Sequence, residues 1–401
     1  MLSAFIIVFG LLLAGYLLFS KRLAASSNWK ATVIPLASIM GSGFLVSAPL
    51  LAGVVANLAV VCMAVLLVFA YAIGGAIRFN IRYFEPIEKD HGIAQDFAFL
   101  ARIVLAAAYF ISVTYYIQLL AAFALNAFHM QDEFMANIVA TLLLLFIGGV
   151  GIWRGLAELE KVESFAISLN LGMICSLVLG LGFYNIQLLS SGAWQLPDIP
   201  SDINTHDLRV LLGLLIVVQG FETSRYLGDK HSVSQRINTM RVAQIVSAVI
   251  YLLFIGFATV LFHNNIGADV TAIIGMTAPV AVALPLLISV AAIGSQFSAA
   301  VADTSGAGGL LEDITNRRLA VRYAYLLILV VTVLICWETN VNAIIGYASR
   351  AFALFYALQC IVAFLVARQQ RELPHRPLLL CFFAVLAVLC MLVCALGVPS
   401  A

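Results

Sequence analysis

The chain alternates along its whole length between long apolar stretches and short polar ones. The apolar stretches run for about 20 residues or more, the length that a helix needs to cross roughly 30 Å of hydrocarbon. They predict about twelve membrane-spanning helices and therefore an all-α polytopic membrane protein with a single membrane domain over residues 1–401. The predicted spans are residues 2–20, 31–56, 57–78, 96–128, 133–153, 162–188, 208–228, 241–263, 279–305, 320–338, 341–367 and 376–398.

Two of these spans contain a predicted break in the helix. A break inside lipid leaves backbone groups unpaired at several kcal/mol each, so it persists only where protein or a water-filled cavity satisfies them. Each break falls in the first of five consecutive spans, and a corresponding pair of this kind points to a transporter binding site. Small residues that serve only close helix packing are the alternative for the first break. The breaks are Gly41-Ser42-Gly43 in residues 31–56 and Gly220-Phe221-Glu222-Thr223-Ser224 in residues 208–228.

Lysine and arginine gather in every second loop, beginning with Lys21 and Arg22 after the first span, and Arg209 is the one exception. The rule that positive loops stay inside places these loops in the cytoplasm and both termini outside, in an inner or plasma membrane. Residues 2–19 lack a basic segment before them, which favours a retained helix over a signal peptide.

The alternating topology divides the spans into two sets. Residues 31–188 enter from the cytoplasm and residues 208–367 from outside, so two five-helix units would form an inverted repeat. Residues 2–20 are then an extra N-terminal helix, and residues 376–398 are a trailing one.

Composition narrows the range of partners. The chain is 63% hydrophobic and 10% charged, which excludes an ordinary soluble domain, and its net charge of +1 implies no nucleic-acid partner. The seven cysteines lie inside apolar spans, and the six histidines form no metal set. The expected partners are the lipid bilayer and a small-molecule substrate, with no cofactor beyond Na⁺ or H⁺ as a coupling ion. The sequence leaves the oligomeric state open.

The motifs at both breaks resemble those of amino acid permeases. The first resembles their glycine-rich first helix, although Pro49 follows the glycines later than the permease proline does. Over nearly its whole length the chain is similar to the amino acid–polyamine–organocation (APC) superfamily, which has the LeuT-type fold. The matching runs are Ile39-Met40-Gly41-Ser42-Gly43-Phe44, Gly220-Phe221-Glu222 and Leu227-Gly228-Asp229-Lys230.

Other features resemble sodium:solute symporters, including the extra N-terminal helix and the serine-rich span at residues 279–305. Two further runs carry this resemblance, Tyr115-Tyr116-Ile117-Gln118-Leu119 and Glu312-Asp313-Ile314. Together the resemblances imply an ion-coupled symporter for a small organic solute, an amino acid or a related compound, that works by alternating access. A transporter-fold sensor without transport and a proton-coupled permease or exchanger are the alternatives. No His-Asp-Ser or metal constellation supports an enzyme.

The breaks supply most candidate substrate ligands. Helix N-termini favour anions, so the amides near residues 42–44 are candidates for a substrate carboxylate. Aromatic side chains near the breaks are candidate gates or walls, including Tyr116, although packing alone also explains such residues. The candidate substrate-binding residues are Gly41, Ser42, Gly43, Phe44, Tyr115, Gln118, Gln219, Phe221, Glu222 and Tyr347.

The serine-rich span suggests an ion site, because hydroxyl and carbonyl oxygens suit a hard monovalent cation. In sodium-coupled relatives the matching helix supplies hydroxyls beside the first break. Bonds from each hydroxyl to its own helix are the alternative. The permease group can place a lysine in the fifth core helix, but none lies deep in residues 162–188, so sodium is preferred over a proton. The candidate ion ligands are Ala37, Ser38, Met40, Asn170, Ser295 and Ser298, with Asp303 and Thr304 in a second register.

Glu222 is the strongest single candidate for a coupling residue. A carboxylate near the middle of a span is costly unless it is paired or protonated. Arg225 lies three residues later and would share a helix face with it. The resemblance implies that Glu222 couples gating to protonation or helix position. Arg225 is a second coupling candidate because of its spacing from Glu222, not because of the resemblance, and a purely structural Glu222–Arg225 pair is the alternative.

Overall fold

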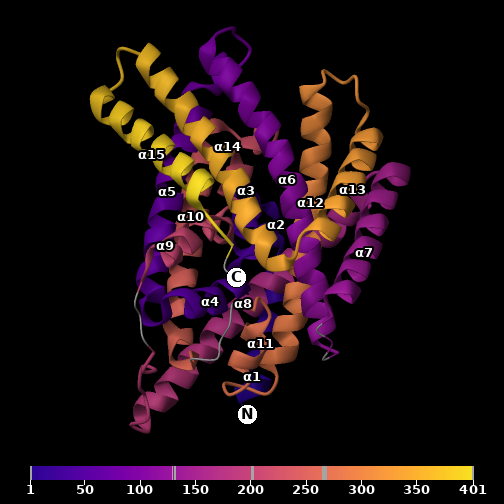
Figure 1. The fold of residues 1–401 in the computed structure, drawn as a ribbon, viewed down its shortest axis with the longest axis vertical. Coiled ribbons are helices and arrows are strands. Elements are labelled where there is room, and N and C mark those ends of the chain that lie inside the picture. Colours follow the sequence, from indigo (N-terminus) through magenta and orange to yellow (C-terminus); the bar gives the residue numbers. More distant parts are fainter. Residues whose placement is uncertain (1, 129, 131, 200–202, 264–268, 400–401) are drawn as a thin grey trace.

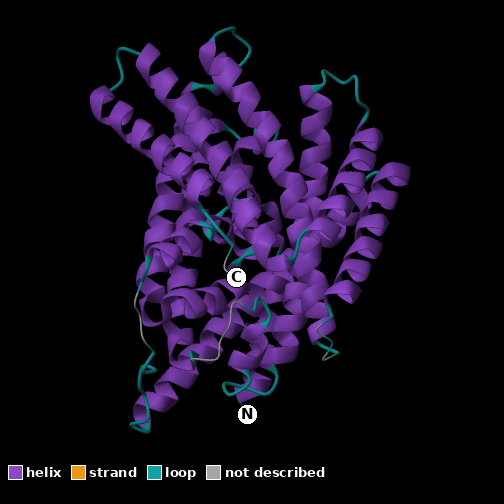
Figure 2. Ribbon diagram, in the orientation of Figure 1, coloured by secondary structure: helices purple, strands orange, loops and turns teal. Residues whose placement is uncertain are grey.

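The structure is a computed structural model of residues 1–401, and it describes all of them except residues 1, 129, 131, 200–202, 264–268 and 400–401. The described residues form helices and loops and contain no strand (Figure 2), which confirms the all-α polytopic fold. The α-helices are α1 (Leu2–Phe19), α2 (Lys21–Ala25), α3 (Ser27–Ser42), α4 (Phe44–Val55), α5 (Ala59–Tyr83), α6 (Ile93–Asn126), α7 (Glu133–Arg154), α8 (Ala157–Ser190), α9 (Thr205–Leu212), α10 (Val233–Ala258), α11 (Ala272–Thr277), α12 (Leu284–Ile314), α13 (Val321–Glu338), α14 (Val341–Gln369) and α15 (Arg376–Leu396). The 3₁₀ helices are η1 (Ala56–Leu58), η2 (Glu85–Ile87), η3 (Leu215–Val218), η4 (Phe221–Leu227) and η5 (Thr259–Leu261).

Ten segments in the described part of the chain are long and apolar enough to cross a membrane. One of them, Ser27–Tyr83, contains α3, α4 and α5 and so covers two predicted spans. The predicted span at residues 208–228 is not among the ten, because α9 ends at Leu212 and 3₁₀ turns follow. Both exceptions fall on the spans that were expected to be broken.

Several helices extend beyond the predicted spans. α12 continues to Ile314 rather than ending at residue 305, and α6 begins at Ile93. α8 begins at Ala157, so Lys161 lies within this helix, although its side chain is outside the described residues. Polar residues are tolerated there because helix ends project past the apolar layer into water.

Helices from the two halves of the chain pack against each other in pairs. α5 packs on α10, α6 on α12 and α7 on α13, while α3 lies against η4. Figure 1 shows α7, α12 and α13 on one side of the molecule and α5, α10 and α15 on the other. Each pair joins helices of the same rank in the two predicted sets, which is the pairing expected of an inverted repeat. The division into two five-helix units remains a prediction.

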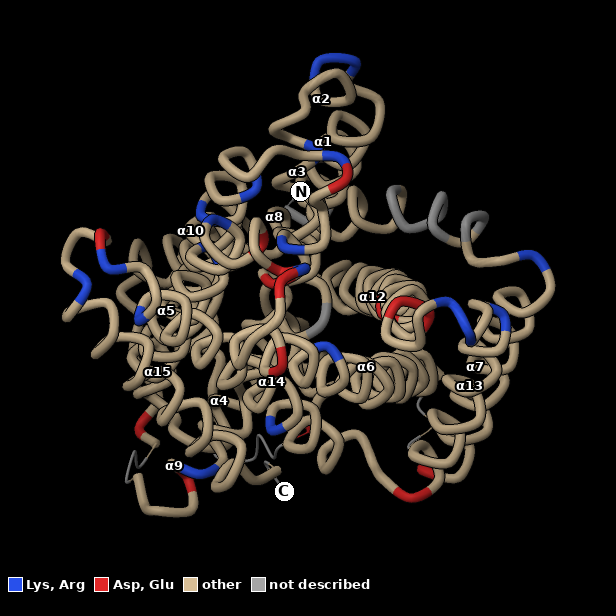
Figure 3. Tube along the Cα trace, turned by 90° about the horizontal axis from the view of Figure 1, so that it is seen from above, with Lys and Arg blue, Asp and Glu red and all other residues tan. Residues whose placement is uncertain are grey.

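Three basic loops lie at one end of the molecule. The loops after α5, α12 and α14 are at the upper end of Figure 1, and the N-terminus is at the lower end. Figure 3 looks down on the upper end and shows basic and acidic positions near the centre of the molecule. All three loops belong to the set predicted to face the cytoplasm, and we call this end the basic end.

Candidate functional site

The first break lies at Gly43. α3 ends at Ser42 and α4 begins at Phe44, and Gly43 joins them at φ −116° and ψ −8°. This backbone conformation is open to residues other than glycine, so the conformation alone does not explain the glycine. The break falls where the Gly41-Ser42-Gly43 run predicted it.

The second break is wider than the sequence predicted. α9 ends at Leu212, the single 3₁₀ turn η3 follows, and Gln219 is extended. Gly220 then adopts φ 113°, a left-handed conformation that residues with a Cβ rarely adopt, before η4 begins. The regular helical hydrogen bonds are therefore lost on both sides of η3.

Side chains from neighbouring helices satisfy backbone groups that this break frees. Ser349 on α14 accepts from Ile216 N at 2.9 Å and donates to Gly213 O at 2.6 Å. Tyr251 on α10 donates its hydroxyl to Val217 O and lies 3.0 Å from Ile39 O of the first broken helix. Both side chains are fully buried, as the cost of unpaired backbone in lipid requires.

The two breaks face each other at close range. A Cβ placed on Gly43 would lie 2.6 Å from Val217 Cβ and closer still to Val217 Cα. A Cβ on Gly220 would lie 2.8 Å from Ile39 N and 2.5 Å from Ser38 Oγ. These separations are well below an ordinary carbon contact, so both glycines are required for the approach of one broken helix to the other.

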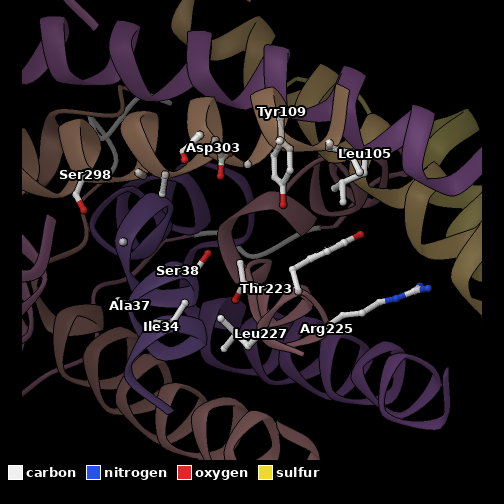
Figure 4. Close-up of a pocket in the computed structure, with 18 of the residues that line it drawn as sticks. Ile34, Ala37, Ser38, Leu105, Tyr109, Thr223, Arg225, Leu227, Ser298 and Asp303 are labelled. Carbon is white, nitrogen blue, oxygen red and sulfur yellow. The ribbon is translucent and has the colours of Figure 1, made fainter. Parts of the chain in front are cut away.

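A cavity of about 890 Å³ begins at the breaks and extends toward the basic end. Its walls come from α3, α6, α8, η4 and α12, and charged residues of η2 and α10 line its outer part. Figure 4 shows Tyr109 and Asp303 pointing into this space from one wall and Ser38 and Thr223 from the opposite one. The cavity is therefore polar near the breaks and wide enough for a small organic molecule.

Most candidate ion ligands line the cavity. Ser295 donates to Gly41 O at 2.6 Å, which places the α12 hydroxyls beside the first break. Asp303 accepts a hydrogen bond from Ser112 of α6. The residues of the ion set that line the cavity are Ala37, Ser38, Asn170, Ser295, Ser298 and Asp303.

Two candidates of the ion set do not line the cavity. Thr304 donates to Ala300 O at 2.6 Å, a bond to its own helix, so its hydroxyl is used locally. Met40 is buried in the apolar core. No group of three or more His, Cys, Asp and Glu residues suited to a metal ion occurs in the described part of the chain.

Among the candidate substrate residues, Gly41 lines the cavity and several others are placed elsewhere. Gln118 donates to Cys336 O and Thr339 O at 3.0 and 2.9 Å, toward the end of α13. Tyr347 is 46% exposed on α14 and is not a cavity wall. Phe44 packs on Tyr251 with ring centroids 5.1 Å apart.

Of the aromatic residues near the second break, some line the cavity and others do not. Phe221 stacks on Tyr356 at 5.2 Å, so it packs rather than facing the cavity. Tyr115 is buried away from the cavity, whereas Tyr116 lines it. The side chain of Ser42 lies outside the described residues.

Glu222 does not pair with Arg225, so the structural Glu222–Arg225 pair is wrong. Glu222 Oε2 accepts from Gly220 N at 3.0 Å and from the Tyr356 hydroxyl at 2.8 Å, and the residue is 1% exposed. Arg225 instead donates to Gln359 on α14 and reaches Glu88, the residue after η2, at 3.5 Å. Glu222 therefore holds the backbone of its own break.

Ion pairs surround the outer part of the cavity. Arg236 of α10 binds Glu85 of η2 through two nitrogens, at 2.8 and 2.6 Å, and also donates to Arg225 O at 2.8 Å. Arg102 of α6 binds Asp313 of α12 at 2.8 Å. These pairs link the α5–α6 loop to η4 and α10, and α6 to α12.

Sequence reasoning missed three residues that support the site, namely Tyr251, Tyr356 and Gln359. Gln359 accepts from Asn80 Nδ2 at 3.0 Å as well as from Arg225. Tyr356 and Gln359 lie three residues apart in a predicted span, and polar residues at that spacing share one helix face. This spacing was the available signal, whereas nothing local distinguishes Tyr251 from a packing aromatic.

Two comparisons with known proteins find relatives of this chain. A family model described as an APC superfamily transporter matches residues 21–397, a range that begins just after α1. An uncharacterized protein of Aquifex aeolicus (strain VF5) is 41% identical over 367 residues, which make up 89% of this chain and 89% of the relative.

Proposed function

The chain belongs to the APC superfamily of transporters, and from this premise we propose that it is an ion-coupled symporter for a small organic solute, an amino acid or a related zwitterion. The observation that carries the proposal is the cavity of about 890 Å³ that starts where two broken helices meet. Small-molecule sites have volumes of this order, and transporters bind solute between half-helices near the bilayer midplane.

The substrate carboxylate is assigned to the first break. The Gly220 amide of the second break already donates to the protein's own carboxylate, Glu222. The amides that begin α4, from Gly43 onward, have no side-chain cap. A helix N-terminus of this kind favours an anion, so an amino acid would place its carboxylate there.

Sodium is the proposed coupling ion. Ser38, Ser295 and Ser298 all line the cavity, and Ser295 lies within hydrogen-bond distance of Gly41 O. Hydroxyl and carbonyl oxygens are suitable ligands for a hard cation. The ion would thus bind where α12 meets α3 and would stabilise the break against which the solute binds.

A proton is the second candidate coupling ion, and Glu222 is the observation that favours it. Its carboxyl group is 1% exposed at the second break, where a charge is costly. Gain or loss of a proton would change how strongly Glu222 Oε2 holds Gly220 N and Tyr356. Proton movement would then act directly on the backbone of the break.

In alternating access the cavity would open to one side of the membrane at a time. The structure has its cavity extending to the basic end, among Glu85, Glu88 and Arg236. With the basic end in the cytoplasm, this form would be the one that releases solute inward.

Counterflow tests transport without assuming a coupling ion. Proteoliposomes loaded with an unlabelled amino acid mixture are diluted into trace labelled amino acids, and protein-dependent transient accumulation is measured. Accumulation of at least one amino acid supports the proposal. No counterflow from protein that is folded and inserted would contradict it and favour a sensor that keeps the fold without transport.

A further inference from the structure

A short segment that follows α15 lies against the outer half of the second broken span. This segment consists of residues 397–399, and we call it the strap. Figure 1 shows α15 running down from the basic end, with the chain continuing past it toward the label C. Val398 N of the strap donates to Arg209 O of α9 at 3.1 Å. The strap is therefore tied to α9 by a backbone hydrogen bond.

Two glycines allow the strap to lie directly on the backbone of its neighbours. A Cβ on Gly213, at the end of α9, would overlap Val398 O. A Cβ on Gly346 of α14 would lie 2.8 Å from Pro399 N and 3.0 Å from Pro399 Cδ. These separations are well below ordinary contacts, so a larger residue at either position would displace the strap. The strap thus packs closely on both α9 and α14.

Two arginines fasten the end of α15 to the same two helices. Arg209 of α9 donates from Nε to Leu396 O at 3.0 Å, and Arg350 of α14 donates from Nε to Cys394 O at 2.7 Å. Carbonyl groups in the last turn of a helix lack partners within the helix and attract cations. The end of α15 is therefore anchored to α9 and to α14, and this anchoring positions the strap that follows.

The strap lies on the side of the breaks that is closed in this structure. The cavity extends from the breaks to the basic end, and none of the described residues that line it belongs to α9, α14 or the strap. Ser349 of α14 donates to Gly213 O, so α14 and the strap hold the same residue at the end of α9. We call the side opposite the basic end the outer side.

Resting on the transport function above, we propose that the strap holds the outer side closed by fixing α9 to α14. In alternating access one side opens as the other closes, and a broken span lets its two halves move separately. For α9 to leave α14, Val398 must give up its bond to Arg209 O and Pro399 must leave Gly346. The strap therefore favours the form that is open at the basic end over the form that is open at the outer side.

A cysteine on α9 reports whether this helix leaves its place. Val210 is 2% exposed, so the cysteine of Val210→Cys reacts only when α9 separates from its neighbours. Whole cells that express the full-length protein are treated with a maleimide that does not cross membranes, because the outer side is predicted to face outward. The rate measured for each variant without the reporter cysteine is subtracted.

Two substitutions loosen the strap, and a third is the control. In Gly346→Ala the three atoms nearest to the added methyl group all belong to Pro399, so the strap must move. We expect the reporter to react about tenfold faster, which corresponds to roughly 1.4 kcal/mol lost by the closed form. Pro399→Gly removes the ring that packs on Gly346 and should raise the rate in the same direction. It serves as the second variant if Gly346→Ala does not fold. Gly149→Ala in α7 is the matched control, because a Cβ there meets nothing within 4 Å.

The outcomes separate the strap from the transport function. Faster labelling in Gly346→Ala and Pro399→Gly, with Gly149→Ala at the wild-type rate, supports the proposal. An unchanged rate in either folded strap variant overturns it, and so does an equal rise in Gly149→Ala, because the loosening is then not local to the strap. Counterflow is measured on the same proteins. Wild-type protein without counterflow contradicts the proposed transport, whereas the labelling rates still decide whether the strap holds α9 in place.

Discussion

Gly43→Ala tests whether the two broken helices depend on direct contact. The backbone conformation at Gly43, φ −116° and ψ −8°, accepts alanine, so the added methyl group acts through space alone. It would lie 2.6 Å from Val217 Cβ and 2.9 Å from Val217 Cγ1. Carbon atoms normally approach to about 3.5–4.0 Å, so one broken helix must move by roughly 1 Å.

The cost of that movement is about 2–3 kcal/mol, the upper part of the range for overpacking, because the obstacle includes backbone of η3. Thermal unfolding in detergent should show the loss, and uptake should fall because the cavity starts at this contact. Gly256→Ala in α10 is the matched control, since a Cβ there meets nothing within 4 Å. Alanine is the better helix former, so this control should be neutral or slightly stabilising. A Gly43→Ala protein as stable and active as the control would refute the reasoning.

Three further substitutions test the site. Glu222→Gln keeps an oxygen acceptor but fixes a neutral side chain, so stability should survive while uptake falls sharply or loses its pH dependence. Normal uptake with lowered stability would reject a coupling role. Ser298→Ala should weaken the sodium dependence of uptake. The control Ser289→Ala removes a hydroxyl that is bonded to its own helix and should leave the sodium dependence unchanged, so identical sodium titrations for both variants would exclude this ion site. Glu85→Gln leaves the buried guanidinium of Arg236 without a carboxylate and should lower the free energy of unfolding by roughly 3 kcal/mol, measured by thermal unfolding. The cost is at the low end for buried pairs because Glu85 is partly exposed. Unchanged stability would mean that this pair is dispensable.

The spans and the position of the first break could be predicted from the sequence because both depend on local signals. Apolar length determines where a helix can cross lipid, and the break between α3 and α4 falls at Gly43, the second of the two glycines around Ser42. The extent of the second break could not be predicted in this way. The turn at Leu215–Val218 depends on Ser349 and Tyr251, which come from other helices and satisfy its backbone.

The candidate site was predicted in outline but not residue by residue. The set on α3 and α12, including Ser38 and Ser298, lines the cavity because both helices pass the first break. Gln118 and Tyr347 point elsewhere, since the rotation of a helix about its axis is set by its neighbours. For the same reason the partner of Arg225 is Glu88, on a loop distant in sequence, and not the nearby Glu222.

Sodium-driven accumulation is the most direct test of the account. Proteoliposomes containing the wild-type protein are given trace labelled amino acids with an inward sodium gradient, with an equal potassium gradient or with neither. The account predicts accumulation above the external concentration only with the sodium gradient. Counterflow that occurs normally while no sodium gradient drives accumulation would contradict sodium coupling, and accumulation driven by a proton gradient instead would assign the coupling to H⁺.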